Sequence, residues 1–179
     1  MSSKAGSNWA FRIMAFIHDN ALRRRFSDPY QTLEIAGLKA GQNVLEVGCG
    51  PGFFTIPAAK IVTETGKVYA LDIHPLAIER VQRKIEIEKV TNVEPILANI
   101  TNTGFPEESL DLAFLFGVPR IIRNNQFFTK TLIELYRILR PTGIISIKSS
   151  QNKIIEKAEE LKYTYLRNKK GIFLFSKVT

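Results

Sequence analysis

The residues best suited to chemistry lie in one short stretch, residues 43–55, with the sequence NVLEVGCGPGFFT. Gly48, Gly50 and Gly52 recur at alternate positions directly after an apolar run typical of a buried strand. A glycine lets the backbone turn sharply, and lets a ligand approach closely, where a Cβ atom would block it. Glu46 stands inside the apolar run, where a carboxylate costs free energy unless a positive group pairs with it. The pattern predicts a strand, a tight turn and a helix, with a partly cationic ligand at the strand end.

Two other interpretations of this stretch stay open. A tight turn between a strand and a helix needs no ligand, although three glycines and a misplaced acid exceed what such a turn requires. A nicotinamide dinucleotide site has the fingerprint G-x-G-x-x-G, which requires a glycine where this chain has Phe53. The chain instead has G-x-G-x-G with Pro51 inside it, so the cradle for a pyrophosphate is incomplete.

A second acid, Asp72, follows the apolar run 67–71. It comes after the glycines at about the interval, roughly 20 residues, at which dinucleotide-binding folds place an acid on the ribose hydroxyls. A carboxylate there accepts hydrogen bonds from both ribose hydroxyls of any adenosine cofactor. The alternative role is a cap for the helix that starts at Pro75, but His74 directly precedes that proline and is better placed for capping.

The motif around Glu46 resembles the first motif of the class I S-adenosylmethionine-dependent methyltransferases, which is close to (V/L)-(L/D)-(E/D)-x-G-x-G-x-G. The resemblance runs from about residue 43 to the C-terminus. It implies an α/β fold, a Rossmann-like doubly wound sheet of seven strands with one antiparallel strand and helices on both faces. It also implies S-adenosylmethionine as the cofactor, with Asp72 on the ribose and Ile73 on the adenine. The cofactor-binding residues that it implies are Glu46, Gly48, Cys49, Gly50, Gly52, Asp72, Ile73, Asn99, Ile100 and Phe116.

One position departs from the family pattern. Residues 98–114, ANITNTGFPEESLDLAF, resemble the third segment of the family, and Asn99 falls where the family usually has aspartate. An aspartate there accepts a hydrogen bond from the adenine amino group. Asn99 accepts through its carbonyl oxygen, but without the assistance of a charge. We therefore expect somewhat weaker cofactor binding than in relatives with the acid.

No pattern identifies a catalytic base, and methyl transfer requires one only when the nucleophile must lose a proton. Three residues are candidates for the acceptor site: His18 and Tyr30 as bases, and Arg120 as an anchor for an anionic acceptor. The tetrapeptide (D/N)-P-P-(Y/F) of amino-group methylases is absent, which disfavours a nucleic-acid adenine methylase. The likeness to the ubiquinone and menaquinone biosynthesis branch implies a small, perhaps lipophilic, acceptor. The alternatives are an RNA methyltransferase and a cofactor-binding protein without turnover.

The composition indicates one globular domain without a membrane span. The chain has 179 residues, a net charge of +8 and 45% apolar residues, and no apolar run approaches the roughly 20 residues that a membrane helix needs. The single cysteine, Cys49, cannot form an internal disulfide, and no signal-peptide pattern is present, so we expect a cytoplasmic protein. No Cys/His cluster has the spacing of a metal site. The charge permits an RNA or lipid-surface partner, but the basic residues are spread along the chain, which favours a solvated basic face.

Apolar periodicity predicts the elements that position these motifs. An amphipathic helix over 9–25 packs on the core, covers the active site as a lid, or contacts a membrane surface. We expect residues 1–41 to form an N-terminal helical cap and residues 42–179 the cofactor-binding domain, in one compact unit. Further helices are predicted over 29–36, 53–63, 75–89, 125–139 and 152–161. Strands are predicted over 44–47, 67–71, 93–98, 111–116, 144–148, 163–167 and 172–178. The sequence does not indicate an oligomeric state.

Overall fold

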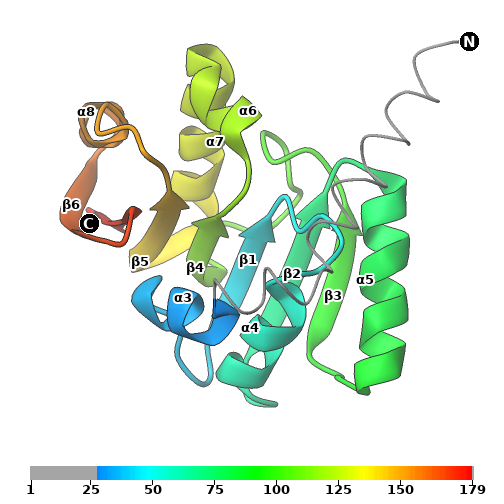
Figure 1. Cartoon of the computed structure of the whole chain (residues 1–179). Coiled ribbons are helices and arrows are strands. Elements are labelled where there is room, and N and C mark those ends of the chain that lie inside the picture. The colour runs from blue at the N-terminus through cyan, green and yellow to red at the C-terminus, as the bar shows by residue number, and fades with distance from the viewer. Residues whose placement is uncertain (1–27, 179) are drawn as a thin grey trace, which may run out of the picture.

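The structure, a computed structural model, describes residues 28–178. The helix predicted over 9–25 and the candidate base His18 lie outside the described residues. Seven strands form one sheet in the order β3-β2-β1-β4-β5-β7-β6, as Figure 1 shows. Neighbouring strands are parallel from β3 to β5, whereas β7 is antiparallel to both β5 and β6. The predicted doubly wound sheet with one antiparallel strand is therefore confirmed.

The elements keep close to the predicted bounds. The strands are β1 Asn43–Val47, β2 Lys67–Asp72, β3 Val93–Leu97, β4 Leu110–Leu115, β5 Leu139–Lys148, β6 Tyr163–Lys169 and β7 Ile172–Lys177. The helices are α3 Pro29–Ile35, α4 Thr55–Val62, α5 Pro75–Glu88, α6 Pro119–Arg123, α7 Asn125–Ile138 and α8 Ile154–Glu159. The sequence did not predict the short helix α6, and it placed the start of β5 five residues too late.

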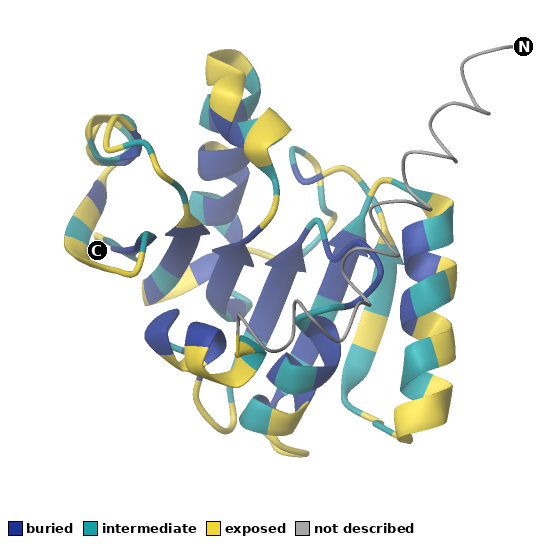
Figure 2. Ribbon diagram, in the orientation of Figure 1, coloured by how far each residue is buried: buried dark blue, intermediate teal, exposed yellow. Residues whose placement is uncertain are grey.

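The sheet is buried on both faces, which explains why its central strands are almost wholly apolar. On one face, Leu33 of α3 and Ala58 of α4 pack with alternate residues of the strands, such as Val44 and Leu112. On the other face, Leu132 of α7 and its neighbours pack with the intervening strand residues. Figure 2 shows the resulting buried centre with exposed residues at the rim. Glu46 has the parity of Val44, so its side chain is directed toward α4.

Local capping fixes where three helices begin. Asp28 accepts a hydrogen bond from the Tyr30 amide at 2.9 Å, and His74 accepts one through Nδ1 from the Leu76 amide at 3.3 Å. Asn124 caps α7 by accepting from the Phe127 amide at 3.0 Å. Each cap satisfies a backbone N–H that has no partner inside the helix. Because His74 caps α5, the carboxylate of Asp72 is not needed for that purpose.

Within residues 28–178, no helix combines the length and the apolar character required to cross a bilayer.

Candidate active site

The glycine loop between β1 and α4 is fastened to the end of β2. The amides of Gly48 and Cys49 both donate to the Leu71 carbonyl, at 2.8 and 3.0 Å. The next amide, that of Gly50, donates to Asp72 Oδ2 at 2.9 Å, and Asp72 Oδ1 accepts from the His74 amide at 2.9 Å. A carboxylate oxygen accepts more than one hydrogen bond, so both oxygens retain the capacity to bind ribose hydroxyls. The acid predicted to bind ribose therefore also holds the loop in place.

The glycines of the loop serve different purposes. Gly48 has φ +72°, and a Cβ atom there would lie 2.4 Å from Val118 Cγ1, so this position brings the β4 loop against the β1 loop. Gly50 has φ +52°, and a Cβ atom there would meet no atom within 4 Å. At Gly52, a Cβ atom would lie 3.2 Å from Val81 of α5. Gly50 thus borders open space directly beside Asp72, and contact between this space and the cofactor stays a prediction.

Glu46 is a buried acid at the end of β1. Glu46 is only 3% exposed. Thr55 of α4 donates a hydrogen bond from its Oγ1 to Glu46 Oε2 at 2.5 Å. Burial raises the pKa of Glu46 to about 8, although the hydrogen bond from Thr55 acts in the opposite direction. Without a ligand, the acid is therefore mostly protonated at neutral pH. A cationic group bound above the strand end would favour its carboxylate form, which fits the sulfonium and ammonium groups of S-adenosylmethionine.

Cys49 contributes its backbone rather than its thiol. The side chain is buried and packs with Ala70, Ile78 and Val81, on the side of the loop that faces α5. Burial raises the pKa of the Cys49 thiol well above its usual range. The thiol is therefore neither a nucleophile nor a surface for the cofactor, and contact through the Cys49 backbone stays a prediction.

The ends of β2 and β3 bring the predicted adenine-binding residues to one edge of the sheet. The Ala98 amide donates to the Asp72 carbonyl at 3.1 Å, so Ile73 and Asn99 follow neighbouring strand ends. Ile73 is 72% exposed, which leaves its apolar side chain free to pack on an adenine ring. Ile100, in contrast, is 3% exposed and belongs to the core on the α7 face. Only the backbone of Ile100 is therefore positioned to meet a cofactor.

The loop that carries Asn99 is anchored to α7 by ionic contacts. The amide and hydroxyl of Thr103 donate to Glu134 Oε1 at 3.0 and 2.6 Å, and Arg137 donates to both oxygens of Glu134. Arg137 also donates to the Phe105 carbonyl at 2.8 Å. The hydrogen bonds from Arg137, followed by those from Thr103, lower the pKa of Glu134 to about 2. The charged Glu134 therefore holds this loop in place at neutral pH.

Asn99 has its own local partners. Its Oδ1 accepts from both the amide and the hydroxyl of Thr101, each at 3.0 Å, which forms a short turn. Because a backbone amide only donates, the atom that faces it must be the side-chain oxygen and not the nitrogen. The departure from the family's aspartate thus leaves an N–H₂ donor where the resemblance implies a second acceptor.

We expect the Asn99→Asp variant to bind the cofactor about fivefold more tightly. One carboxylate oxygen would keep both bonds to Thr101, and the other would accept from the adenine amino group with the assistance of its charge. Isothermal titration with S-adenosylhomocysteine measures the change. Weaker binding by the variant would show instead that the Asn99 amide donates to a ring nitrogen of adenine.

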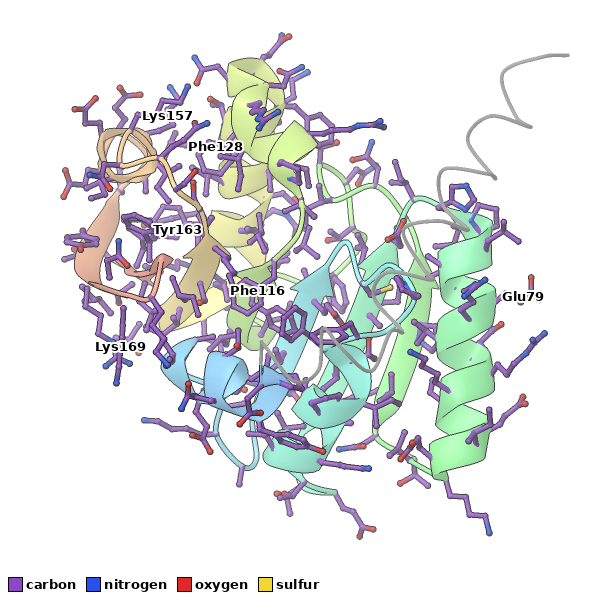
Figure 3. The ribbon with its side chains drawn as sticks, in the orientation of Figure 1. Glu79, Phe116, Phe128, Lys157, Tyr163 and Lys169 are labelled. Carbon is purple, nitrogen blue, oxygen red and sulfur yellow. The ribbon has the colours of Figure 1, made fainter. Side chains whose placement is uncertain are left out.

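A cavity of about 320 Å³ adjoins the glycine loop at the ends of β4 and β5. Its lining combines aromatic, small and basic residues: Phe53, Phe54, Phe116, Gly117, Val118, Pro119, Ile122, Arg123, Lys148, Ser149, Ser150 and Gln151. Figure 3 shows Phe116 near the centre of the molecule, whereas Lys169 lies at its outer edge. We call this cavity the acceptor pocket, because it is open space next to the predicted cofactor cradle.

The candidate acceptor residues are distributed unevenly about this pocket. Phe116, which was predicted to bind the cofactor, lines this pocket, and its contact with the cofactor stays a prediction. Arg120 lies on α6 but is not among the lining residues, whereas Arg123 of the same helix is. Tyr30 lies near Lys60, which belongs to the last turn of α4. That end of α4 is the one away from the glycine loop, and Tyr30 is not among the residues that line the pocket. The sequence did not predict that Arg123 and Lys148 line the pocket, because their positions depend on how α6 and β5 pack.

The alternate glycines, Asp72 and the buried acid Glu46 lie together at the carboxyl ends of β1 and β2, where doubly wound sheets bind their ligands. Residues 38–173 match the family described as "Methyltransferase domain", so the chain belongs to this family and the resemblance is confirmed. Among curated relatives, the demethylmenaquinone methyltransferase of Geobacillus sp. (strain WCH70) is 29% identical over 149 residues. The ubiquinone/menaquinone biosynthesis C-methyltransferase UbiE of Escherichia coli O1:K1 is 32% identical over 127 residues. These alignments cover 82% and 70% of this chain, but only 62% and 49% of the two relatives.

Solved structures share the fold. A SAM-dependent methyltransferase from Aquifex aeolicus superimposes with a TM-score of 0.77 and 24% identity, covering 91% of this chain and 95% of that one. TrmN from Thermus thermophilus superimposes with a TM-score of 0.70 and 17% identity, covering 84% of this chain and 48% of TrmN. At these identities, the superpositions support the architecture and not a particular acceptor.

Proposed function

We propose that this chain transfers the methyl group of S-adenosylmethionine to a small, lipophilic acceptor. The observation that carries the proposal is the link between Gly50 and Asp72. The Gly50 amide fixes the carboxylate of Asp72, while the side of Gly50 that a Cβ atom would fill is open. A loop that served only as a turn would not need an acid and an empty space at the same point.

The chain's own residues have a limited task in this reaction. When bound, the cofactor supplies a methyl carbon on a sulfonium; a nucleophile bonds to that carbon, and the electron pair of the broken C–S bond goes to sulfur. Asp72 would hold the ribose, and Glu46 would face the cationic part of the cofactor. The aromatic side chains of the acceptor pocket would orient the acceptor and exclude water. Such a site functions without a dedicated base when the nucleophile arrives deprotonated.

The pocket lining supports a lipophilic acceptor. Phe54 contacts Phe53 edge-to-face with ring centroids 4.8 Å apart, and Phe116 with centroids 5.3 Å apart. Packed rings of this kind offer an apolar surface on which a planar acceptor can stack. The curated relatives are a demethylmenaquinone methyltransferase and a ubiquinone/menaquinone biosynthesis C-methyltransferase, which agrees with an acceptor of this type.

Several further assignments remain proposals. We assign the N-terminal residues 1–41 the role of a cap on the site and the cytoplasm as the location, from the sequence patterns alone. RNA as the acceptor and membrane contact through residues 9–25 remain alternatives that the net charge permits.

The Gly50→Ala variant tests the proposal. We expect it to bind S-adenosylmethionine at least about tenfold more weakly, because the added Cβ occupies the cradle. The matched control is Gly41→Ala, since Gly41 also has a positive φ, +82°, and an added Cβ atom there would lie 3.7 Å from Thr65 Oγ1, in ordinary contact, before the start of β1 and away from the glycine loop. In both variants the free energy of unfolding should fall by a similar amount, about 1–2 kcal/mol, because alanine disfavours the left-handed backbone conformation.

Titration with the cofactor and transfer of a radiolabelled methyl group to demethylmenaquinol give the readouts. The control should keep the wild-type affinity and transfer rate. If Gly50→Ala and Gly41→Ala behave alike in both assays, Gly50 borders no cofactor and the proposal fails.

A further inference from the structure

The acceptor pocket contains positive charge that a lipophilic acceptor alone does not explain. Arg123 lies at the end of α6, and Lys148 is the last residue of β5. Both residues are exposed, and their side chains help to line the pocket. Within residues 28–178, neither Arg123 nor Lys148 forms an ion pair. No acidic residue is among the described residues that line the pocket. Among residues 28–178, the pocket therefore carries two cations without an acidic partner.

Part of the pocket lining is apolar and aromatic, from Phe53, Phe54 and Phe116. Phe116 is 5% exposed and packs between Phe54 and Phe114, with ring centroids 5.3 and 5.1 Å away. These contacts fix the rings, so the wall presents a rigid surface. The volume of about 320 Å³ lies at the lower end of the range for ligand pockets, about 300–1,000 Å³, and suits one or two fused rings.

A buried polar atom in the same pocket lacks a partner. Gln151 lines the pocket, and its Oε1 is buried without any hydrogen bond. Its backbone is held in place, since the Gln151 amide donates to the Ser149 hydroxyl at 3.0 Å. Buried acceptors are nearly always satisfied in native structures, because an unsatisfied one costs about 1–3 kcal/mol. This oxygen has almost no accessible surface, so a ligand reaches it only after the Gln151 side chain rotates, and an anionic group offers it no hydrogen.

We propose that the acceptor is a one- or two-ring aromatic compound with an anionic group, a carboxylate or a phosphate, which Arg123 and Lys148 bind while its ring packs on the phenylalanines. The inference rests on the proposed function for the role of the bound compound as acceptor. Charge-assisted hydrogen bonds to carboxylate or phosphate are the strongest that arginine and lysine form. Partial exclusion of water by the aromatic wall strengthens them further. A neutral quinol would gain no charge-assisted hydrogen bond from either cation, which would stay hydrated.

The test compares two probes that differ in charge and little in shape: 2-naphthoate and its neutral amide, 2-naphthamide. Isothermal titration at neutral pH, with and without saturating S-adenosylhomocysteine, measures each affinity. We expect the wild-type chain to bind 2-naphthoate at least about tenfold more tightly than 2-naphthamide. Lys148→Met and Arg123→Met should each lower the affinity for 2-naphthoate about fivefold and leave that for 2-naphthamide unchanged. The double variant should lose the preference.

The control variant is Lys130→Met, which removes an exposed lysine of α7 that does not line the pocket. It should retain the full preference for 2-naphthoate. A titration with 2-naphthyl phosphate distinguishes the two anionic groups, and a preference for either over the amide supports the inference. Equal binding of the charged and neutral probes would overturn it. The inference would also be overturned if the Arg123→Met and Lys148→Met variants lost equal affinity for both probes. A loss of affinity for 2-naphthoate in Lys130→Met as large as in those two variants would overturn it as well.

The failure of this inference is distinguishable from that of the proposed function. Binding of S-adenosylhomocysteine is measured in the same series and does not depend on the probes. If the cofactor product does not bind but the preference for 2-naphthoate holds, the methyl-transfer proposal fails and the anion pocket stands. If the product binds but the preference for 2-naphthoate is absent, the anion-pocket inference fails and the methyl-transfer proposal stands.

Discussion

Asp72→Ala is expected to lower the affinity for S-adenosylhomocysteine by at least about 100-fold, because each hydrogen bond from a ribose hydroxyl to a carboxylate is worth about 1.5–3 kcal/mol. The same change removes the acceptor for the Gly50 amide, which Asp72 Oδ2 holds at 2.9 Å, and for the His74 amide. The loss therefore combines two effects, a missing ribose partner and a loosened glycine loop. Isothermal titration of the wild-type chain and the variant measures their sum.

A second ligand separates the two effects of Asp72→Ala. The 2′-deoxy form of S-adenosylhomocysteine lacks one ribose hydroxyl, so the wild-type chain should bind it about tenfold more weakly than the parent compound. The Asp72→Ala variant should bind both compounds equally, since no acceptor remains for that hydroxyl. Asp72→Asn keeps one acceptor oxygen and should fall between. If Asp72→Ala still discriminates against the 2′-deoxy compound as strongly as the wild type does, Asp72 does not hold the ribose.

The parts of the site that the sequence predicted are those determined by local chemistry. Asp28 before Pro29 gave the start of α3, because a side-chain acceptor followed by proline is a local signal for a helix start. The alternate glycines placed the turn after β1, and Glu46 marked the strand end, because an acid in an apolar run needs a reason. Each of these signals depends only on neighbours in the chain.

The parts that the sequence did not predict depend on packing between distant segments. Helix α6 has five residues, too few for an apolar period to be recognised. Arg123 enters the acceptor pocket because α6 turns back over the end of β4, and the sequence pointed instead to Arg120. Lys148 faces the same pocket because β5 and β4 lie side by side. Arg123 is on a helix and Lys148 is at a strand end, and nothing in the sequence near either residue indicates that the two line the same pocket.

Glu46 makes the stability of the ligand-free protein depend on pH in a defined direction. Its pKa is about 8 in the fold, because burial disfavours the charge, and about 4.3 in an unfolded chain. Between these values the folded chain keeps the proton while the unfolded chain has released it. The free energy of unfolding therefore falls as pH rises, by about 1.4 kcal/mol per pH unit from one acid, and levels off above the folded-state pKa. At neutral pH, the raised pKa of Glu46 therefore lowers the free energy of unfolding by about 3–4 kcal/mol relative to acidic pH.

Glu46→Gln is therefore expected to stabilise the ligand-free protein and to weaken its function. The amide keeps an acceptor for the Thr55 hydroxyl but has no charge to lose, so the variant should be about 3–4 kcal/mol more stable at neutral pH. The gain should vanish near pH 4, where the wild-type acid is protonated in both states. Urea unfolding at the two pH values measures it. A variant that is less stable than the wild type at neutral pH would show that the buried acid is compensated within the fold.

The same variant shows whether Glu46 faces the cationic part of the cofactor. With its pKa at about 8, about nine tenths of the wild-type Glu46 side chains carry a proton at neutral pH. A bound cation lowers that pKa, so S-adenosylmethionine should release close to one proton as it binds, and its affinity should rise with pH up to about 8. Titration in phosphate and in Tris buffer, whose ionisation enthalpies differ, counts the protons. Glu46→Gln should release none and should bind at least about tenfold more weakly.

Comparison with S-adenosylhomocysteine identifies which cation Glu46 senses. That compound lacks the sulfonium charge but keeps the amino-acid ammonium group. If Glu46 faces the sulfonium, the product should release far less than one proton, and its affinity should change little in Glu46→Gln. If Glu46 faces the ammonium, both ligands should release the same amount. Binding of S-adenosylmethionine to the wild-type chain without any proton release would mean that no cation lies near Glu46. The buried acid would then serve only its hydrogen bond with Thr55, and the cofactor would have to lie elsewhere along the edge of the sheet.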